Sequence, residues 1–370
     1  MRRVDVSKSE LEAFEVRRGD VFFTRTSETV EEIGVAAAML DPAKDTVFSG
    51  FVLRARPTDD RLDDLFKAYC FLPSYFRKQV IARGTYTTRA LTNGRSLSAC
   101  MLAVPPQAEQ RAIAEALSDI DTEITRTAEL IAKKRYLRTG AMQRLLSGDE
   151  RLPDFSVPWQ KVRLDEIGTW RGGMTPSMRV SRYWKGGTFP WLSSGDVKSE
   201  RLSNSGMHIT EDAISEKKTT IVPSESIVIV MRSGILRRYL PVAFLERPMA
   251  INQDIKALTV YPDFHPLFIQ NMIKWQGEEI LKTCLKAGTT VESIDFSWLK
   301  SFELPVPSEK SEQTAIAAVL SDMDAEITAL EVRLEKTKAL KQGMMQALLT
   351  GRVRLPVQGE ALNSLEVAHA

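Results

Sequence analysis

The sequence has little cysteine and histidine and almost no net charge. Of its 370 residues, three are cysteine and three are histidine, and the formal net charge is +2. Cys70, Cys100 and Cys284 are widely spaced, which argues against a disulfide framework and predicts a reducing, cytoplasmic location. Overall charge gives no indication of nucleic-acid binding, so any basic surface is expected to be local.

Membrane and catalytic signatures are also missing. No run approaches the roughly 18 apolar residues that a membrane helix needs, and the first residues lack the apolar segment of a signal peptide. No phosphate-binding loop, dinucleotide fingerprint or adenine-methyltransferase motif is present. Asp196-Val197-Lys198 and Asp254-Ile255-Lys256 resemble half of a nuclease motif but lack its upstream acidic partner. We therefore predict a non-catalytic chain with no metal site, no cofactor of its own and no membrane association.

An internal duplication is the most informative feature that is present. Shifted by 203 residues, Glu109–Pro153 aligns without a gap on Glu312–Pro356, and 23 of the 45 positions are identical. The best-conserved stretches are EQ-x-AIA-x-x-LSD near the start, G-x-MQ-x-LL-x-G near the end, and Arg-Leu-Pro after it. A period this long indicates a duplicated domain rather than a solenoid of small repeats.

Both copies of this segment are predicted to be long helices. Apolar residues recur at alternating spacings of four and three, which is typical of a coiled-coil seam. The predicted seam consists of Ile113, Leu117, Ile120 and Ile124 in the first helix, and of Ile316, Leu320, Met323, Ile327, Leu330 and Leu334 in the second. Prolines precede each helix, and Gly148 and Gly351 suit its end. About 40 helical residues span about 60 Å. A core helix of an ordinary bundle is the alternative.

The segments before the helices mix short β-rich runs with loops and a helical stretch, which predicts an α+β fold. We expect two mixed α/β domains separated by two long antiparallel helices. The predicted parts are a first domain, a central helix, a second domain, a C-terminal helix and a disordered tail, at residues 1–104, 105–150, 151–306, 307–352 and 353–370. The second domain opens with a section of about 50 residues, Pro158–Met207. The first domain has no counterpart of this section. A start codon placed too far downstream, a truncated product and a half-domain completed by another chain all explain this, and we favour the first two.

Several loops of the second domain combine cations, glycines and hydroxyls, which suit phosphates and base edges. The candidate DNA-contacting residues there are Arg171, Gly172, Gly173, Thr175, Ser193, Ser194, Lys198, Arg232, Ser233, Arg237, Arg238, Asn252, Gln253, Thr289 and Thr290. Asn252-Gln253 suits adenine, but an Asn-Gln pair in a turn is equally often structural. Solvated loops and turn-capping hydroxyls are the alternatives for the other residues, and we assign Trp184 and Trp191 to the core.

The first domain carries fewer such candidates. They follow a strand and open a later Gly-Thr loop, as in the second domain, and comprise Thr24, Arg25, Thr26, Ser27, Thr85, Thr87 and Arg89. The two domains share this plan but few residues outside the helices. One scaffold with two divergent faces is what two different binding specificities require.

These motifs in this order resemble the specificity subunit of type I restriction–modification enzymes. The resemblance rests on GGMTPS, YWKGGTFPWLSSGDVK, INQDI, GTT and the duplicated helix motifs, and it covers roughly residues 16–356. It implies two target-recognition domains on one double-stranded DNA, with the helices as a ruler between two half-sites. It also implies docking of two modification subunits, which methylate adenine with S-adenosylmethionine, and of restriction subunits that use ATP and Mg²⁺. An orphan subunit that acts as a non-catalytic regulator or decoy is the alternative function.

Overall fold

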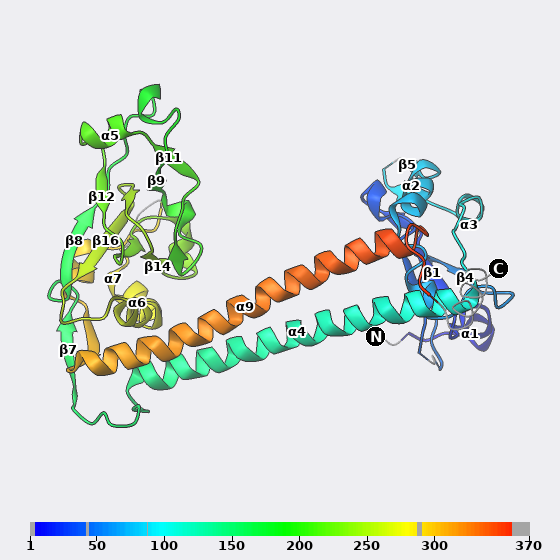
Figure 1. Cartoon of the computed structure of the whole chain (residues 1–370), viewed down its shortest axis with the longest axis horizontal. Coiled ribbons are helices and arrows are strands. Elements are labelled where there is room, and N and C mark those ends of the chain that lie inside the picture. The colour runs from blue at the N-terminus through cyan, green and yellow to red at the C-terminus, as the bar shows by residue number, and fades with distance from the viewer. Residues whose placement is uncertain (1–3, 42–43, 87, 287–290, 357–370) are drawn as a thin grey trace, which may run out of the picture. The chain divides into compact units, whose positions relative to one another are not determined.

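A computed structural model describes residues 4–41, 44–86, 88–286 and 291–356. The chain forms two compact units, unit 1 (Met1–Ile131 with Ala329–Ala370) and unit 2 (Ala132–Thr328). Two long helices, α4 (Gln107–Ser147) and α9 (Lys310–Leu348), contribute to both units (Figure 1). The predicted tail from residue 357 onward, and the candidates Thr87, Thr289 and Thr290, lie outside the described residues.

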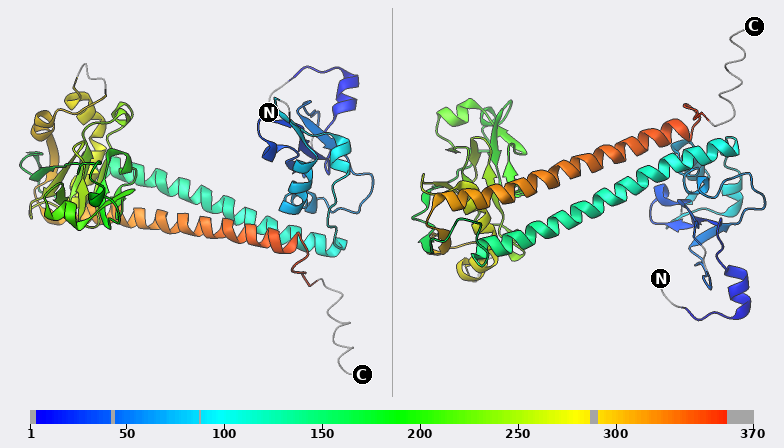
Figure 2. Two further views of the ribbon diagram at one scale, coloured as in Figure 1. Left: turned by 90° about the horizontal axis from the view of Figure 1, so that it is seen from above. Right: turned by 60° about the horizontal axis from the view of Figure 1, so that its bottom comes forward.

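The two helices lie antiparallel in each unit, as the spacing of their apolar residues predicts (Figures 1 and 2). They end before Gly148 and Gly351, whose φ angles of 77° and 72° lie in the left-handed region that glycine adopts without strain. Of the ten predicted seam residues, Ile113, Leu117, Ile316, Leu320 and Ile327 are buried, and Ile120, Ile124, Met323, Leu330 and Leu334 are half-buried. The α+β fold with two long antiparallel helices is therefore confirmed.

Ion pairs between the helices repeat with the sequence duplication. In unit 1, Lys341 on α9 donates to Asp121 on α4 at 2.5 Å, and Tyr69 donates to the same carboxylate at 2.9 Å. In unit 2, Arg138 on α4 donates to Asp324 on α9 at 2.9 Å. Both pairs join positions that the 203-residue shift makes equivalent. The duplicated helices therefore pack by the same contacts in both units.

A second duplicated contact, between a glutamate and an arginine, occurs in each unit. Glu109, which is 3% exposed, accepts hydrogen bonds from Arg354 at 2.5 and 2.6 Å. The equivalent Glu312, 1% exposed, accepts from Arg151 at 2.5 and 2.7 Å. The hydrogen bonds from Arg354 hold the pKa of Glu109 below its ordinary value. The conserved Glu of the helix start and the conserved Arg of Arg-Leu-Pro thus form one ion pair in each unit.

Unit 2 is built on two main sheets. The five-stranded sheet has the order β10-β14-β13-β16-β8, and the four-stranded sheet has the order β11-β9-β15-β12. The bounds in the first sheet are β8 Gly168–Gly172, β10 Arg201–Leu202, β13 Ile227–Val230, β14 Val242–Leu245 and β16 Ile255–Val260. Those in the second are β9 Phe189–Leu192, β11 Met207–Ile209, β12 Thr220–Val222 and β15 Met249–Ile251. All four residues of β13 are buried because both faces of this central strand are covered.

The remaining elements of unit 2 enclose its core. A two-stranded sheet pairs β7 (Trp159–Arg163) with β17 (Glu303–Pro307), immediately before α9. The short helices are α5 Glu211–Ser215, α6 Pro266–Trp275, α7 Gly277–Cys284, α8 Phe296–Ser301, η3 Ser181–Tyr183, η4 Ser194–Asp196 and η5 Gly234–Arg237. The largest apolar cluster joins α6 and the sheet to the first turns of α9 and the last turns of α4. Helix packing and domain folding therefore share one core.

Unit 1 contains two small sheets, with the orders β3-β1-β4 and β2-β6-β5. The strands are β1 Val21–Thr24, β2 Thr26–Ser27, β3 Ala36–Ala38, β4 Val52–Ala55, β5 Thr85–Tyr86 and β6 Ala90–Leu91. The helices are α1 Lys8–Phe14, α2 Ser74–Ala82, α3 Gly94–Ser98, η1 Val30–Glu32 and η2 Phe66–Ala68. The helical stretch expected in this domain is divided into η2 and α2, because Pro73 precedes α2 and lacks the N–H that a continuous helix needs.

The strand registers show that the duplication extends beyond the helices. In unit 1, Phe22 lies opposite Ala37 and Arg54; in unit 2, the equivalent Val228 lies opposite Ala243 and Ala257. The order β3-β1-β4 thus corresponds to β14-β13-β16. In unit 2 this group is flanked by β10 and β8, whereas β3 and β4 are the edge strands of their sheet among the described residues of unit 1. Within the described part of the chain, no helix is both long and apolar enough to cross a membrane.

Candidate nucleic-acid interface

The predicted DNA-contacting loops of unit 2 meet at one end of its sheets. Met231 follows β13 and joins two of these loops through its main chain: its N–H donates to Asp254 at 2.7 Å, and its carbonyl accepts from Ile294 at 2.8 Å. Arg232 forms an isolated bridge with Ser293, and the Ser233 N–H donates to the Glu292 carbonyl at 3.1 Å. The basic turn at 232–238 therefore lies against the Asn252–Asp254 turn and against the segment that follows the Gly-Thr-Thr loop.

The glycine-rich loop reaches the same end of the sheets. The Met174 N–H donates to the Ile251 carbonyl at 3.0 Å, and the Thr175 hydroxyl donates to the Gln253 side chain at 2.5 Å. The Asn252 N–H donates to the Leu192 carbonyl at 2.9 Å, which places the loop after β9, with Ser193 and Ser194, beside the others. Four segments that are separated in sequence thus form one surface.

Unit 1 repeats this convergence with different side chains. Arg25, equivalent to Met231, donates its N–H to the Phe51 carbonyl at 2.8 Å, and its carbonyl accepts from Thr92 at 3.0 Å. Strand β6 pairs with both β2 and β5, so that Thr26 and Thr85 each lie opposite Leu91. The candidates at 24–27 and the described candidates of the Gly-Thr loop, Thr85 and Arg89, therefore belong to one surface in unit 1, as the shared sequence plan predicts.

Exposure divides the candidates of unit 2 into two groups. Asn252 is 6% exposed and its amide oxygen accepts from the Asp254 N–H at 3.1 Å, so its side chain belongs to the turn. Ser193 donates to Asp196 at 2.6 Å. Burial raises the pKa of Asp196, but the hydrogen bonds from Ser193 and Gly206 outweigh it and leave that pKa lowered. The exposed candidates are Arg171, Thr175, Lys198, Arg232, Arg237, Arg238 and Gln253, of which Thr175 and Gln253 are hydrogen-bonded to each other.

The exposed arginines differ in whether their guanidinium groups already form ion pairs or hydrogen bonds within the protein. Arg237 forms an ion pair with Glu292, and Arg171 donates to the Ile221 carbonyl at 3.3 Å. Arg232 and Arg238 have no ion pair among the described residues. These two can therefore contact a phosphate or a base without first breaking an ion pair.

At some positions of these loops, the packing of neighbouring backbone requires glycine. A Cβ at Gly173 would lie 2.1 Å from the Asn252 carbonyl oxygen and 2.2 Å from that of Ile251. A Cβ at Gly172 would meet only the flexible end of Lys256, at 2.6 Å. Gly173 is thus required for close approach of two backbone segments, whatever the loop binds.

The candidates of unit 1 are exposed less evenly. Arg25, Thr85 and Arg89 are exposed, whereas Thr24, Thr26 and Ser27 are half-buried. The Ser27 hydroxyl donates to Glu32 at 2.5 Å. Two further exposed side chains of the candidate loops, Tyr86 in unit 1 and Tyr239 in unit 2, are 62% and 49% exposed and were not among the predicted candidates. In the sequence, each tyrosine stands beside candidate residues, Tyr86 after Thr85 and Tyr239 after Arg238.

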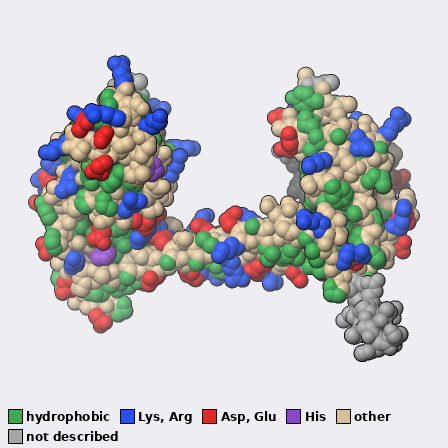
Figure 3. Space-filling model, turned by 45° about the horizontal axis from the view of Figure 1, so that its top comes forward, with side chains coloured by type: hydrophobic (Ala, Val, Ile, Leu, Met, Phe, Trp, Pro, Cys, Tyr) green, Lys and Arg blue, Asp and Glu red, His purple; other side chains and the backbone are tan. Residues whose placement is uncertain are grey.

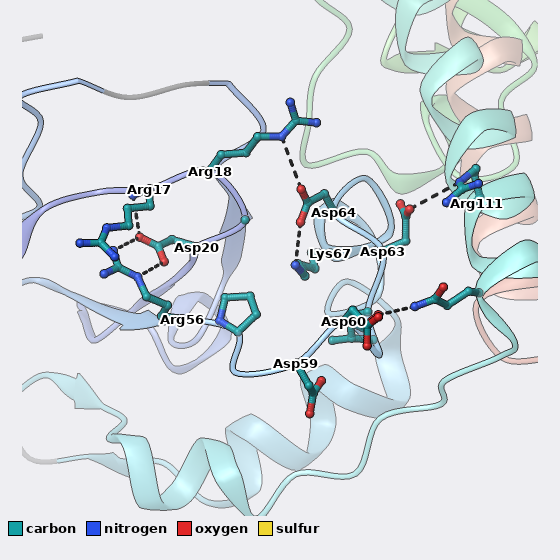
Figure 4. A pocket seen from close by; sticks show the side chains of 14 residues that line it. Arg17, Arg18, Asp20, Arg56, Asp59, Asp60, Asp63, Asp64, Lys67 and Arg111 are labelled. Atoms are coloured by element: carbon teal, nitrogen blue, oxygen red, sulfur yellow. Dashed lines mark hydrogen bonds and ion pairs between the residues drawn. The ribbon is translucent and has the colours of Figure 1, made fainter.

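Charged residues elsewhere pair with one another. A cavity of about 560 Å³ in unit 1 is lined by five cations and five aspartates (Figure 4). Arg56 donates to Asp20 at 2.7 Å, Lys67 to Asp64 at 2.7 Å, and Arg111 lies 3.7 Å from Asp63. Burial raises the pKa of Asp20, but Arg56 outweighs it and leaves it lowered. In unit 2, the residues equivalent to Asp20 and Arg56 are Ser226 and Thr259, which form a neutral hydrogen bond of 2.8 Å in place of the ion pair. The cavity is thus an ion-pair network of unit 1.

Acidic, basic and apolar side chains are interspersed over the visible surface (Figure 3), as the nearly neutral composition predicts. Among the described residues, no group of three or more His, Cys, Asp or Glu side chains is arranged to hold a metal ion.

Asp196 accepts from Ser193 and Gly206, and the Asp254 N–H donates to Asn252, so both half-motifs of a nuclease take part in turns. Trp191 is 5% exposed and stacks edge-on against Trp184, with 5.2 Å between ring centroids, in the core as predicted.

Residues 156–339 match the family model described as the type I restriction modification DNA specificity domain. The chain belongs to the family of type I restriction specificity subunits. A type I specificity subunit of Escherichia coli is 36% identical over 216 residues, which cover 58% of this chain and 52% of the relative. One of Methanocaldococcus jannaschii is 31% identical over 170 residues, covering 45% and 38%. The chain thus aligns with about half the length, or less, of these relatives.

The likeness extends to the fold of the type I specificity subunit. The crystal structure of the S subunit of the type I restriction–modification system from M. genitalium superimposes with a TM-score of 0.60 at 15% identity, covering 91% of this chain and 84% of that one. Family membership confirms the predicted class, a type I restriction specificity subunit. The residue-level DNA contacts and the predicted domain boundaries stay predictions.

Proposed function

We propose that this chain is the DNA-recognition subunit of a type I restriction–modification complex and that each unit reads one half of a bipartite double-stranded DNA target. One observation carries the proposal: the same convergence of loops around Arg25 and around Met231 presents different exposed side chains. A repeated backbone with divergent loop surfaces supports recognition of two different half-sites. Exposed cations and hydroxyls suit phosphates, and Gln253 suits an adenine edge.

The residue test uses Arg232, which is exposed and has no ion pair among the described residues. We expect Arg232→Ala to weaken DNA binding by about 1–3 kcal/mol, roughly 5- to 150-fold, with relaxed preference at one base pair if the guanidinium reads a base. Arg247→Ala is the matched control, because Arg247 is exposed in the turn between β14 and β15, at the opposite end of β13. Binding should be measured by fluorescence anisotropy at several salt concentrations. A uniform loss with a shallower salt slope would assign Arg232 to a phosphate, and an unchanged affinity would remove it from the interface.

The helices are proposed to dock two modification subunits, which carry S-adenosylmethionine. Restriction subunits that use ATP and Mg²⁺ join the same complex. Exposed apolar residues on the helices support a docking role, since Tyr136, Val332 and Leu340 are 79%, 50% and 57% exposed. We expect the chain to co-purify with a modification subunit from its source organism, and we expect adenine methylation at a bipartite motif that is lost when this chain's gene is deleted. Co-purification and methylation profiling of the source genome check this. Methylation that survives the deletion would contradict the proposal.

A further inference from the structure

An acidic side chain, Glu292, lies among the candidate DNA-contacting loops of unit 2 and is paired with an arginine of another loop. Its Oε1 accepts a hydrogen bond from Nε of Arg237. Its second oxygen, Oε2, is buried and has no hydrogen-bond partner within the described part of the chain. Asp196 and Asp254 differ, because their carboxylates accept from Ser193 and Asn252 of their own turns. The Glu292 carboxylate therefore acts on a side chain of a different loop.

The main chain on both sides of this ion pair is anchored. Leu236, which precedes Arg237 in η5, is 1% exposed and belongs to the largest apolar cluster of unit 2. The Glu292 carbonyl accepts from the Ser233 N–H, directly before η5, at 3.1 Å. The hydrogen bond between the two side chains thus joins two fixed points of the backbone. It restricts the directions in which the Arg237 guanidinium group can point.

The hydrogen bond at Nε leaves the outer end of this guanidinium group available. The side chain of Arg237 is 67% exposed, whereas that of Glu292 is only 20% exposed. Nη1 and Nη2 of Arg237 form no hydrogen bond with any described residue. The N–H groups of an arginine form a rigid fork that matches O6 and N7 of guanine in the major groove. A fork that is already held at Nε loses less conformational freedom on contact than a free side chain does.

We propose that Arg237 reads a guanine in the half-site of unit 2 and that Glu292 is the positioning residue that directs its guanidinium group to that base. The inference rests on the proposed DNA-reading function and deepens it, because it assigns a G·C pair to one position of the half-site. A carboxylate on a DNA-binding surface repels phosphates and lowers the affinity for DNA of every sequence. The contribution of Glu292 is therefore to specificity and not to affinity.

This assignment predicts opposite effects of Glu292→Ala on affinity and on specificity. Loss of the negative charge should tighten binding to DNA of random sequence by up to about fivefold, as for one exposed charge, and should steepen its salt dependence. The guanidinium group is then no longer held, so the preference for guanine at one position should fall by at least about threefold. Glu292→Gln retains an acceptor of the same size and should restore most of this preference, while the tighter binding to random DNA remains.

The experiment selects bound sequences from a double-stranded DNA library with randomised positions, using the full-length chain and its variants. Arg237→Lys keeps the charge but lacks the fork, so it should lower the guanine preference at the same position by about 5- to 150-fold, the discrimination of one bidentate contact. Glu246→Gln is the control that also removes one negative charge. Glu246 pairs with Arg201 at 3.4 Å and lies in the turn between β14 and β15, away from these loops. It should leave the base preference unchanged at every position.

The possible failures of this inference and of the proposed function differ. Random DNA that the wild-type chain binds as well as every selected sequence would overturn the DNA-reading function, and this inference with it. A selective wild-type chain whose guanine preferences survive Arg237→Lys or Glu292→Ala would overturn this inference alone. The same holds if Glu292→Ala weakens binding to all sequences equally and lowers the thermal midpoint, because the ion pair then only holds the two loops together. An unchanged thermal midpoint with a reduced guanine preference supports the positioning role.

Discussion

Leu320→Asp is expected to unfold unit 2 under conditions in which the wild-type unit is fully folded. Leu320 is 0% exposed and belongs to the cluster that contains Leu145 and Leu146 of α4 and Phe268 of α6. The substitution removes a buried aliphatic side chain and places an unpaired carboxylate in its position. Truncation of a buried leucine alone costs about 2–5 kcal/mol, and burial of the charge adds to this. The loss therefore approaches the whole stability of an ordinary domain.

The composition provides a reporter for this measurement. All six tryptophans, at positions 159, 170, 184, 191, 275 and 298, lie in unit 2, so the urea midpoint from tryptophan fluorescence follows this unit alone. Ala318→Asp is the control, because Ala318 lies in the same turn of α9 as Leu320 but its side chain is exposed to solvent. It should cost no more than about 0.7 kcal/mol, the difference in helix propensity. Equal midpoints for Leu320→Asp and the wild type would place Leu320 outside the core.

The helix pair shows how far periodicity alone predicts a structure. The spacing of Ile316, Leu320 and Ile327 depends only on the local repeat of the helix, and these residues are buried as predicted. The sequence also predicts that residues 24–27 are the counterpart of the basic turn that begins at Arg232, because the order of strand and turn is repeated. Local pattern and repeated order thus identify the scaffold and the loops that meet at one end of it.

Long-range partners could not be predicted in this way. Asn252 has the composition of an adenine-reading residue, but its amide is used by the Asp254 turn, and only the fold determines that choice. Gly173 is required by carbonyls of Asn252 and Ile251, almost 80 residues later in the chain. Nothing in one sequence distinguishes a glycine that admits DNA from one that admits a neighbouring strand.

The ion pair between Arg151 and Glu312 is the clearest such case, because a repeated Glu-Gln and a repeated Arg-Leu-Pro look like independent motifs. Arg151→Ala is expected to destabilise unit 2 by about 3 kcal/mol, since removing one partner leaves the carboxylate of Glu312, 1% exposed, without its counter-ion. Glu312→Gln should cost less, about 1 kcal/mol, because Arg151 is 25% exposed and can be hydrated.

The double variant Arg151→Ala/Glu312→Gln separates the ion pair from the packing around it. It replaces the buried charge by a neutral amide, so its urea midpoint should lie above that of Arg151→Ala even though it carries one more substitution. The cation–π contact of Arg151 with Trp159 is lost in both variants and cancels in this comparison. If the two midpoints coincide, the cost of Arg151→Ala comes from lost packing on Trp159 and the carboxylate of Glu312 is solvated without Arg151. If the double variant is the more stable one, the buried charge of Glu312 is what Arg151 neutralises, and the same explanation extends to Glu109 and Arg354 in unit 1.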